Sequence, residues 1–199
     1  MNTDNNEYIM QTLYDSRLVK DLMSGWQKAR KRIPDKLSCF EMYLSGSAIA
    51  KTVWNRQLGY DDMYDISDID LIYFDPIHTT YQQEDTVISN TKSVMPNYIS
   101  FRCDVKNQAR VHIWHQEHFG KPLKPYRDIV ETLQVTTTKI QQIAISIDRK
   151  HVIYGDRGDI ISNDIINMVI RPNDKATLPE SYAAKSDKWK SAYPQLAIR

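Results

Sequence analysis

The fold is decided by the segment DIDLIYF at Asp68–Phe74. Apart from its two aspartates, the segment consists of apolar or aromatic residues that favour β-structure, which predicts a central strand. Because side chains alternate along a strand, Asp68 and Asp70 fall on one face, near its start. The segment therefore predicts a buried strand that presents two carboxylates together.

The chain on either side of this strand alternates further strand-like and helical segments. Strands are expected at residues 40–44, 99–105, 143–147 and 151–154, and helices at 48–58, 81–94, 107–118, 129–133 and 160–168. A helical segment at about 5–33 precedes them, and a helical extension at about 175–199 follows. With no repeat and no Ser/Gly-rich linker, we predict a single α/β domain over residues 1–199, a mixed β-sheet with helices packed on it.

Composition excludes several classes of protein. The net charge is +1, from 26 basic and 25 acidic residues, so no overall field attracts long nucleic acid. The chain has neither a signal-peptide pattern at its start nor an apolar run near the roughly 20 residues of a membrane span, which favours a cytoplasmic protein without membrane contact. Cys39 and Cys103 both lie in apolar, strand-like segments, so we expect two buried thiols.

A glycine and a serine follow the first strand-like segment and precede a helix. Gly46 lets backbone amides approach a phosphate, while the helix dipole and the Ser47 hydroxyl add favourable contacts. Ser47 as an ordinary helix cap is the common alternative, and both roles use the same helix end. The turn is therefore a candidate phosphate site.

A third carboxylate, Asp104, lies on the later predicted strand, on the face opposite Phe101 and Cys103. Like charges repel, so a carboxylate group of this kind is most stable with a divalent cation, and Mg²⁺ prefers carboxylates together with phosphate oxygens. Asp65 and Asp75 compete for the third place, and Asp104 is preferred. Asp68, Asp70 and Asp104 are thus the expected catalytic and metal-binding residues.

The order of these features resembles the nucleotidyltransferases of the DNA polymerase beta superfamily, which include CCA-adding enzymes. A narrower resemblance, to a bacterial nucleotidyltransferase-like family of unknown function, rests on GSAI at residues 46–49, ISDIDLIYFD at 66–75, KNQARVHIW at 106–114 and RPN at 171–173. The resemblance implies the polymerase beta-type fold. It also implies that two Mg²⁺ ions bind the three aspartates and that the Gly46-Ser47 turn holds the outer phosphates of a nucleotide.

The function implied is transfer of a nucleoside monophosphate from a magnesium-bound nucleoside triphosphate, with ATP as the expected nucleotide, to a hydroxyl group. The acceptor is a small molecule, an RNA or a protein. In this picture Asp104 activates the hydroxyl. The positive charge for the triphosphate is expected from Lys51, Arg102 and Arg110, with Arg110 ranked first.

Two other functions compete with this one. The first is a non-catalytic nucleotide-binding or antitoxin-like module of the same fold, although clustered carboxylates bring no benefit to a pure scaffold. The second is a histidine-metal hydrolase built on His112, His115 and His118 with Glu117 as its base, but histidines three and six residues apart spread over a wide arc of a helix. The aromatic residues Tyr182, Trp189 and Tyr193 are expected to pack on the domain rather than on a base.

Overall fold

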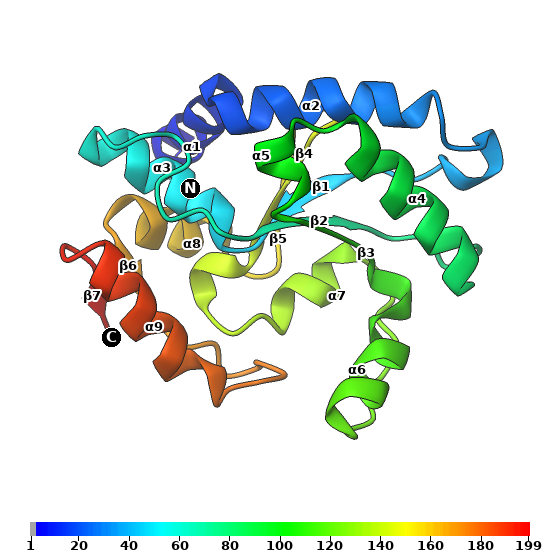
Figure 1. Ribbon diagram of the computed structural model, residues 1–199. Coiled ribbons are helices and arrows are strands. Elements are labelled where there is room, and N and C mark those ends of the chain that lie inside the picture. Colours follow the sequence, from blue (N-terminus) through cyan, green and yellow to red (C-terminus); the bar gives the residue numbers. More distant parts are fainter. Residues whose placement is uncertain (1–2) are drawn as a thin grey trace.

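The structure is a computed structural model that describes residues 3–199, so the first two residues of the expected domain lie outside it. Its centre is a five-stranded mixed sheet in the order β3-β2-β1-β4-β5 (Figure 1). Strand β2 pairs in parallel with β3, and the other neighbours pair antiparallel. The predicted mixed α/β architecture is confirmed.

The strands of this sheet are β1 Tyr43–Ser45, β2 Ile69–Tyr73, β3 Cys103–Asn107, β4 Ile143–Ser146 and β5 Val152–Tyr154. The α-helices are α1 Thr3–Asp15, α2 Arg17–Arg30, α3 Ser47–Leu58, α4 Tyr81–Val94, α5 Asn97–Ser100, α6 Val111–Phe119, α7 Ile129–Gln134, α8 Gly158–Ile166 and α9 Ser181–Ala192. Short 3-10 turns cover Asp35–Leu37, Gln108–Arg110 and Lys139–Gln141, and a small parallel pair joins β6 Val169–Ile170 to β7 Ala197–Ile198. Among the described residues no helix is both long and apolar enough to cross a membrane.

The two faces of the sheet differ in how they are covered. One face carries side chains such as Leu44 and Leu71, which join the main apolar core with the helices. The other face carries Tyr43 and Ile72, which pack on Leu133 of α7 in a small separate cluster. In Figure 1 the helices α2, α4 and α5 lie above the sheet, and α6, α7 and α9 lie below it. The second face is thus left partly open for polar side chains.

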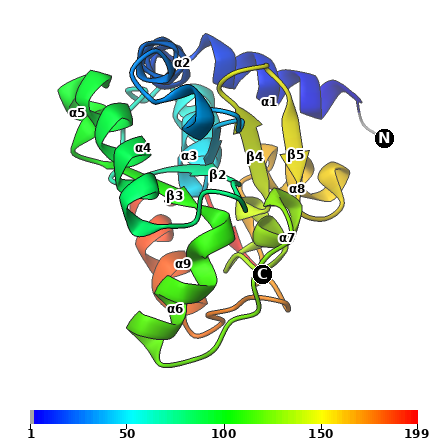
Figure 2. The ribbon, with the colours of Figure 1, turned by 90° about the vertical axis from the view of Figure 1, so that its right-hand side faces the viewer.

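The N-terminal segment expected to be helical at about residues 5–33 is helical, and it consists of two helices. The segment divides into α1 and α2 at Ser16, whose hydroxyl accepts a hydrogen bond from the Val19 amide at 3.2 Å and caps the second helix. The view turned by 90° shows α1 and α2 running along the same side of the molecule (Figure 2). By contrast, the helix expected at residues 81–94 is found with those bounds, and begins with a capping box formed by Thr80 and Gln83.

The strand expected at residues 99–105 begins later than predicted, at Cys103. Pro96 begins the short helix α5, and pairing with β2 starts only at Cys103, opposite Ile69. Phe101, which alternation places in the core, is 88% exposed. Cys39 is another correction, because it is exposed while Cys103 is buried. The residue at which side chains begin to alternate between core and surface is set by pairing with a neighbouring strand. The local sequence pattern holds no information about that pairing.

The C-terminal extension is only partly helical. After α9 the chain ends in β7, which pairs with β6. Tyr193 anchors this region: its ring packs on Trp54, and its hydroxyl donates to Asn55 Oδ1 at 2.8 Å. Trp189 is buried as well, so these two aromatic side chains pack on the domain as expected. This anchoring fixes α9 beside the open face of the sheet.

Replacing Tyr193 with phenylalanine tests the anchor. The change leaves the buried Asn55 carbonyl without its hydroxyl donor, so we expect the free energy of unfolding to fall by about 1–2 kcal/mol. Urea denaturation followed by circular dichroism measures it. The matched control is Tyr8→Phe, at a tyrosine that is 40% exposed, and it should change stability little. Equal effects of the two changes would contradict the assigned role of the Tyr193 hydroxyl.

Candidate active site

Polar side chains form a row across three neighbouring strands. Asp70 of β2 is the register partner of Ser45 of β1 on one side and of Asp104 of β3 on the other. Partners in register point to the same face, here the partly open one that also carries Ile72. Asp68 precedes β2 and is exposed. The structure therefore brings the three predicted aspartates to one edge of the site.

Gly46 follows this row directly and lies against Asp70. Its φ of 77° and ψ of −160° belong to a region that is essentially restricted to glycine. A β-carbon on Gly46 would collide with the Asp70 carboxylate at Oδ2. Helix α3 begins at the next residue, Ser47, so the free amides of its first turn adjoin the carboxylate row. Gly46 and Ser47 thus form the corner that the sequence predicts.

Asp70 lies in an environment that disfavours its negative charge. Burial raises the pKa of its carboxyl group to about 6, and the charges of Asp68 and Asp104 act in the same direction. Lys106 and Lys185 oppose the shift. Among residues 3–199 no group donates a hydrogen bond to the carboxylates of Asp68 or Asp70. Two like-charged, unsatisfied carboxylates are therefore available to a cation.

Lys106 is the present partner of Asp104. It comes from the same face of β3, two residues along, and its ammonium lies 2.5 Å from Asp104 Oδ2. In this state no three His, Cys, Asp or Glu side chains of the described chain are arranged as a ready-made metal site. The donor set nevertheless fits Mg²⁺, because all of its atoms are carboxylate oxygens. A cation bound at Asp104 Oδ2 would compete with the Lys106 ammonium for that atom.

Lys51 does not face the carboxylate row. Its side chain is 3% exposed, and its ammonium contacts Asp65 Oδ2 at 2.6 Å and the Asp65 carbonyl at 2.7 Å. Burial lowers the pKa of Lys51, whereas the hydrogen bond to Asp65 raises it. Asp65 has a positive φ of 53° in the loop that leads to Asp68. Lys51 and Asp65 thus hold this loop together, and neither is part of the row.

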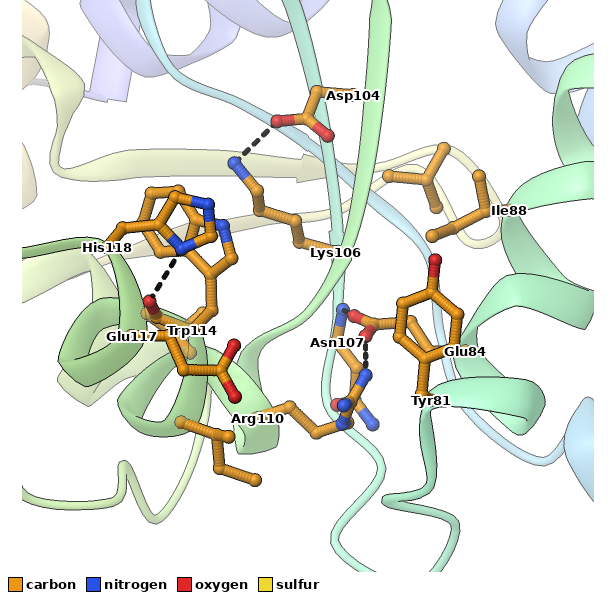
Figure 3. A pocket seen from close by; sticks show the side chains of 13 residues that line it. Tyr81, Glu84, Ile88, Asp104, Lys106, Asn107, Arg110, Trp114, Glu117 and His118 are labelled. Carbon is orange, nitrogen blue, oxygen red and sulfur yellow. Dashed lines mark hydrogen bonds and ion pairs between the residues drawn. The ribbon is translucent and has the colours of Figure 1, made fainter.

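The two predicted arginines occupy different positions. Arg110 forms an ion pair with Glu84 of α4, which also accepts a hydrogen bond from the Asn107 amide at 2.8 Å (Figure 3). Arg102 is exposed at the end of the turn before β3. The third competing acid, Asp75, is buried and accepts hydrogen bonds from two backbone amides of the following turn. None of these three side chains extends the row.

The structure adds one cation that sequence reasoning missed. Lys185 of α9 is half-buried, and its ammonium donates to the Thr137 hydroxyl at 3.3 Å. Burial lowers the pKa of Lys185, while the charges of Asp70 and Asp68 raise it. The ammonium is therefore within electrostatic reach of the acids. In sequence it is one lysine among several on a polar helix, and no local signal distinguishes it.

The three histidines of α6 have separate surroundings. His115 Nδ1 lies 3.0 Å from the Lys121 carbonyl oxygen, and His118 Nδ1 lies 3.0 Å from the Trp114 carbonyl oxygen. His118 also stacks on the Trp114 ring. Glu117 is exposed on the same helix, and no three His, Cys, Asp or Glu side chains of residues 3–199 are arranged to hold a metal ion. The geometry therefore gives the hydrolase hypothesis no support.

Comparison with known proteins identifies the family. The model of a family described as Nucleotidyltransferase matches residues 33–198, which include every element of the carboxylate row and α9. The chain belongs to this nucleotidyltransferase family. The predicted family and its class of enzyme, a transferase, are confirmed. No curated protein matches the chain significantly.

Two solved structures share the nucleotidyltransferase fold. One is a protein whose NMR structure is described as a CCA-adding enzyme head domain, with 18% identity, a TM-score of 0.67 and coverage of 100% of this chain and 98% of that one. The other is a CCA-adding enzyme in complex with CTP, with 15% identity and a TM-score of 0.52. The match covers 90% of this nucleotidyltransferase and 42% of that enzyme. At these identities the likeness shows the fold.

Gly46→Ala tests the corner of the candidate site. The new methyl group meets the Asp70 carboxylate and the backbone is strained, so we expect the free energy of unfolding to fall by about 2–4 kcal/mol. Gly59→Ala is the matched control, because Gly59 also has a positive φ of 68° but a β-carbon added there would have no atom within 4 Å. It should cost about 1 kcal/mol. Chemical denaturation of both variants measures the two losses of stability. Equal losses would contradict the close contact between Gly46 and the Asp70 carboxylate.

The pKa of Asp70 predicts a stability that depends on pH. Between about pH 4 and 6 an unfolded chain loses this proton before the folded one does, so the wild type loses stability as pH rises through that window. Asp70→Asn cannot ionise. In metal-free buffer we expect it to be more stable than the wild type by on the order of 1–3 kcal/mol at pH 7.5 and equally stable at pH 4.

Thermal and urea unfolding across this pH range measure the difference. Asp187→Asn on α9, an exposed position, controls for the general loss of one negative charge. A destabilised Asp70→Asn variant at pH 7.5 would contradict the unfavourable ionisation that burial and the neighbouring acids impose on Asp70.

Proposed function

We propose that this nucleotidyltransferase transfers a nucleoside monophosphate from a nucleoside triphosphate to a hydroxyl group. The observation that carries the proposal is the register of Asp70 with Asp104, directly beside the glycine corner at Gly46. In the reaction a bond forms between the acceptor oxygen and the α-phosphorus. The bond from that phosphorus to the β-phosphate breaks, and pyrophosphate leaves.

Asp68, Asp70 and Asp104 would hold Mg²⁺, for which two ions are expected. When bound, Mg²⁺ would neutralise phosphate charge and polarise the reacting oxygens. Asp104 would orient the acceptor hydroxyl and take its proton. Its edge position on β3 supports this role, because Asp104 is the member of the row furthest from the Gly46 corner.

The phosphates would lie at the corner between β1 and α3. The Ser47 hydroxyl and the first amides of α3 are hydrogen-bond donors there, and the positive end of the helix dipole favours an anion. Lys185 supplies a positive charge next to Asp70 and Asp68. Because Lys51 is tied to Asp65 and Arg110 to Glu84, Lys185 replaces them as the preferred phosphate ligand, with Arg102 in reserve.

The nucleotide is proposed to be ATP. The second structural match has CTP bound, so each of the four common nucleoside triphosphates belongs in the same experiment. The acceptor is proposed to be a hydroxyl group of a small molecule, an RNA or a protein.

The test is incubation of the protein with Mg²⁺, each α-labelled nucleoside triphosphate and a cell lysate that supplies acceptors. We expect transfer of label with release of pyrophosphate, and a loss of at least about 100-fold in Asp68→Asn and Asp70→Asn. Lys185→Met should weaken triphosphate binding about tenfold or more. The control Lys188→Met, at an exposed lysine of the same helix, should bind normally.

Binding is measured separately by isothermal calorimetry with Mg²⁺ and a nucleoside triphosphate. If the wild type neither binds any of the four nucleotides nor transfers label, the proposal fails. Binding without transfer, unchanged by Asp70→Asn, would instead favour a non-catalytic module.

A further inference from the structure

A pocket of about 280 Å³ adjoins the carboxylate row on the far side from Gly46. Strand β3 forms its floor, α4 one wall and α6 the other (Figure 3). Asp104 and Lys106 line it together with Asn107, so the pocket begins where the row ends. Phosphates at the corner and a second ligand in this pocket would therefore reach the row from opposite sides.

The pocket is suited to a flat, apolar body. Tyr81 of α4 and Trp114 of α6 are exposed aromatic side chains that line it, together with Ile88 and Ile113. Exposed aromatic residues around a concave apolar surface are typical of sites that bind organic rings. The volume is close to the lower limit of small-molecule pockets, roughly 300–1,000 Å³, which suits a small ligand.

The charges that line the pocket disfavour an anion. Its lysine and its arginine are already paired, Arg110 with Glu84 and Lys106 with Asp104. Its histidine, His118, stacks on the Trp114 ring. Glu117 adds a further carboxylate at the exposed rim of α6. Lys106 also lies 4.9 Å from the centre of the Trp114 ring, so an ammonium group is already accommodated on this wall.

We propose that this pocket binds the acceptor of the transfer reaction, and that the acceptor is a small hydroxylated compound with a planar ring and no negative charge. The inference rests on the proposed function. The ring would lie between Tyr81 and Trp114, and a hydroxyl group at its end would reach Asp104. An RNA acceptor would bring phosphate charges to a pocket whose lysine and arginine are already paired with carboxylates.

Three probes of similar size and different charge test the class of ligand. Tyrosol is neutral, tyramine is cationic and 4-hydroxyphenylacetate is anionic, and each carries the same hydroxyphenyl ring. The fourth probe, myo-inositol, has hydroxyl groups but no planar ring. Saturation-transfer NMR on the full chain, without nucleotide, should detect tyrosol and tyramine. The anion should bind about fivefold more weakly or worse, and myo-inositol should not bind.

Paired variants locate the binding. Trp114→Ala should weaken tyrosol binding about fivefold or more, because it removes one aromatic wall. Tyr8→Ala is the matched control, since Tyr8 is an aromatic residue of α1 that is 40% exposed against 38% for Trp114, and it does not line this pocket. If Trp114→Ala proves unfolded by circular dichroism, Tyr81→Ala with the control Phe101→Ala answers the same question at two more exposed positions.

The last experiment tests whether the pocket binds the acceptor of the transfer reaction. Tyrosol should inhibit label transfer in the lysate while leaving binding of Mg²⁺ and ATP unchanged. The inference is overturned if the anion binds as well as tyrosol, if myo-inositol binds, or if neither Trp114→Ala nor Tyr81→Ala weakens binding. It is also overturned if tyrosol does not inhibit transfer, or if RNA or protein is still labelled in saturating tyrosol. A wild type that binds the probes but no nucleoside triphosphate contradicts the proposed function instead.

Discussion

The site depends on one unfavourable feature, the burial of the Asp70 carboxylate beside two other acidic side chains. Strand pairing fixes this side chain beside Asp104, and Gly46 closes in on its carboxylate. Burial and like charge together disfavour the ionised form. Only a rigid, well-packed sheet can hold such a group in place, and the apolar core beneath β2 supplies that rigidity. Ionisation of Asp70 is therefore unfavourable in this position, and positive charge near its carboxylate makes it less so.

Positive charge reaches the row from two different sources. Lys106 comes from the neighbouring position on β3, and Lys185 comes from a helix near the end of the chain. Lys106 is paired with Asp104 and also lowers the pKa of Asp70, whereas Lys185 acts on Asp70 and Asp68. The ligand-free protein therefore carries its own counter-ions, which a metal-bound triphosphate would have to displace or recruit.

Sequence pattern was sufficient for the parts of the site that depend on local geometry. The period of two along β2 places Asp68 and Asp70 together, and a glycine before a helix predicts the corner. The register of Asp104 with Asp70 could only be assumed, because the order of strands is a property of the whole sheet. Lys51 illustrates the same limit, because its proximity to Ser47 in the helix did not reveal that its side chain turns to Asp65. Lys185 could not be predicted from the sequence, since only tertiary packing brings α9 to the acids.

The anchoring of α9 has a consequence for the order in which this protein acquires its site. Tyr193 joins Asn55 across 138 residues of chain. Contacts so distant in sequence form late, and during synthesis the ribosome releases α9 after all strands of the central sheet. A nascent chain therefore contains the clustered acids before it contains Lys185. Until the last helix docks, the three aspartates depend on Lys106 and on ions from the surrounding solution for their balance of charge.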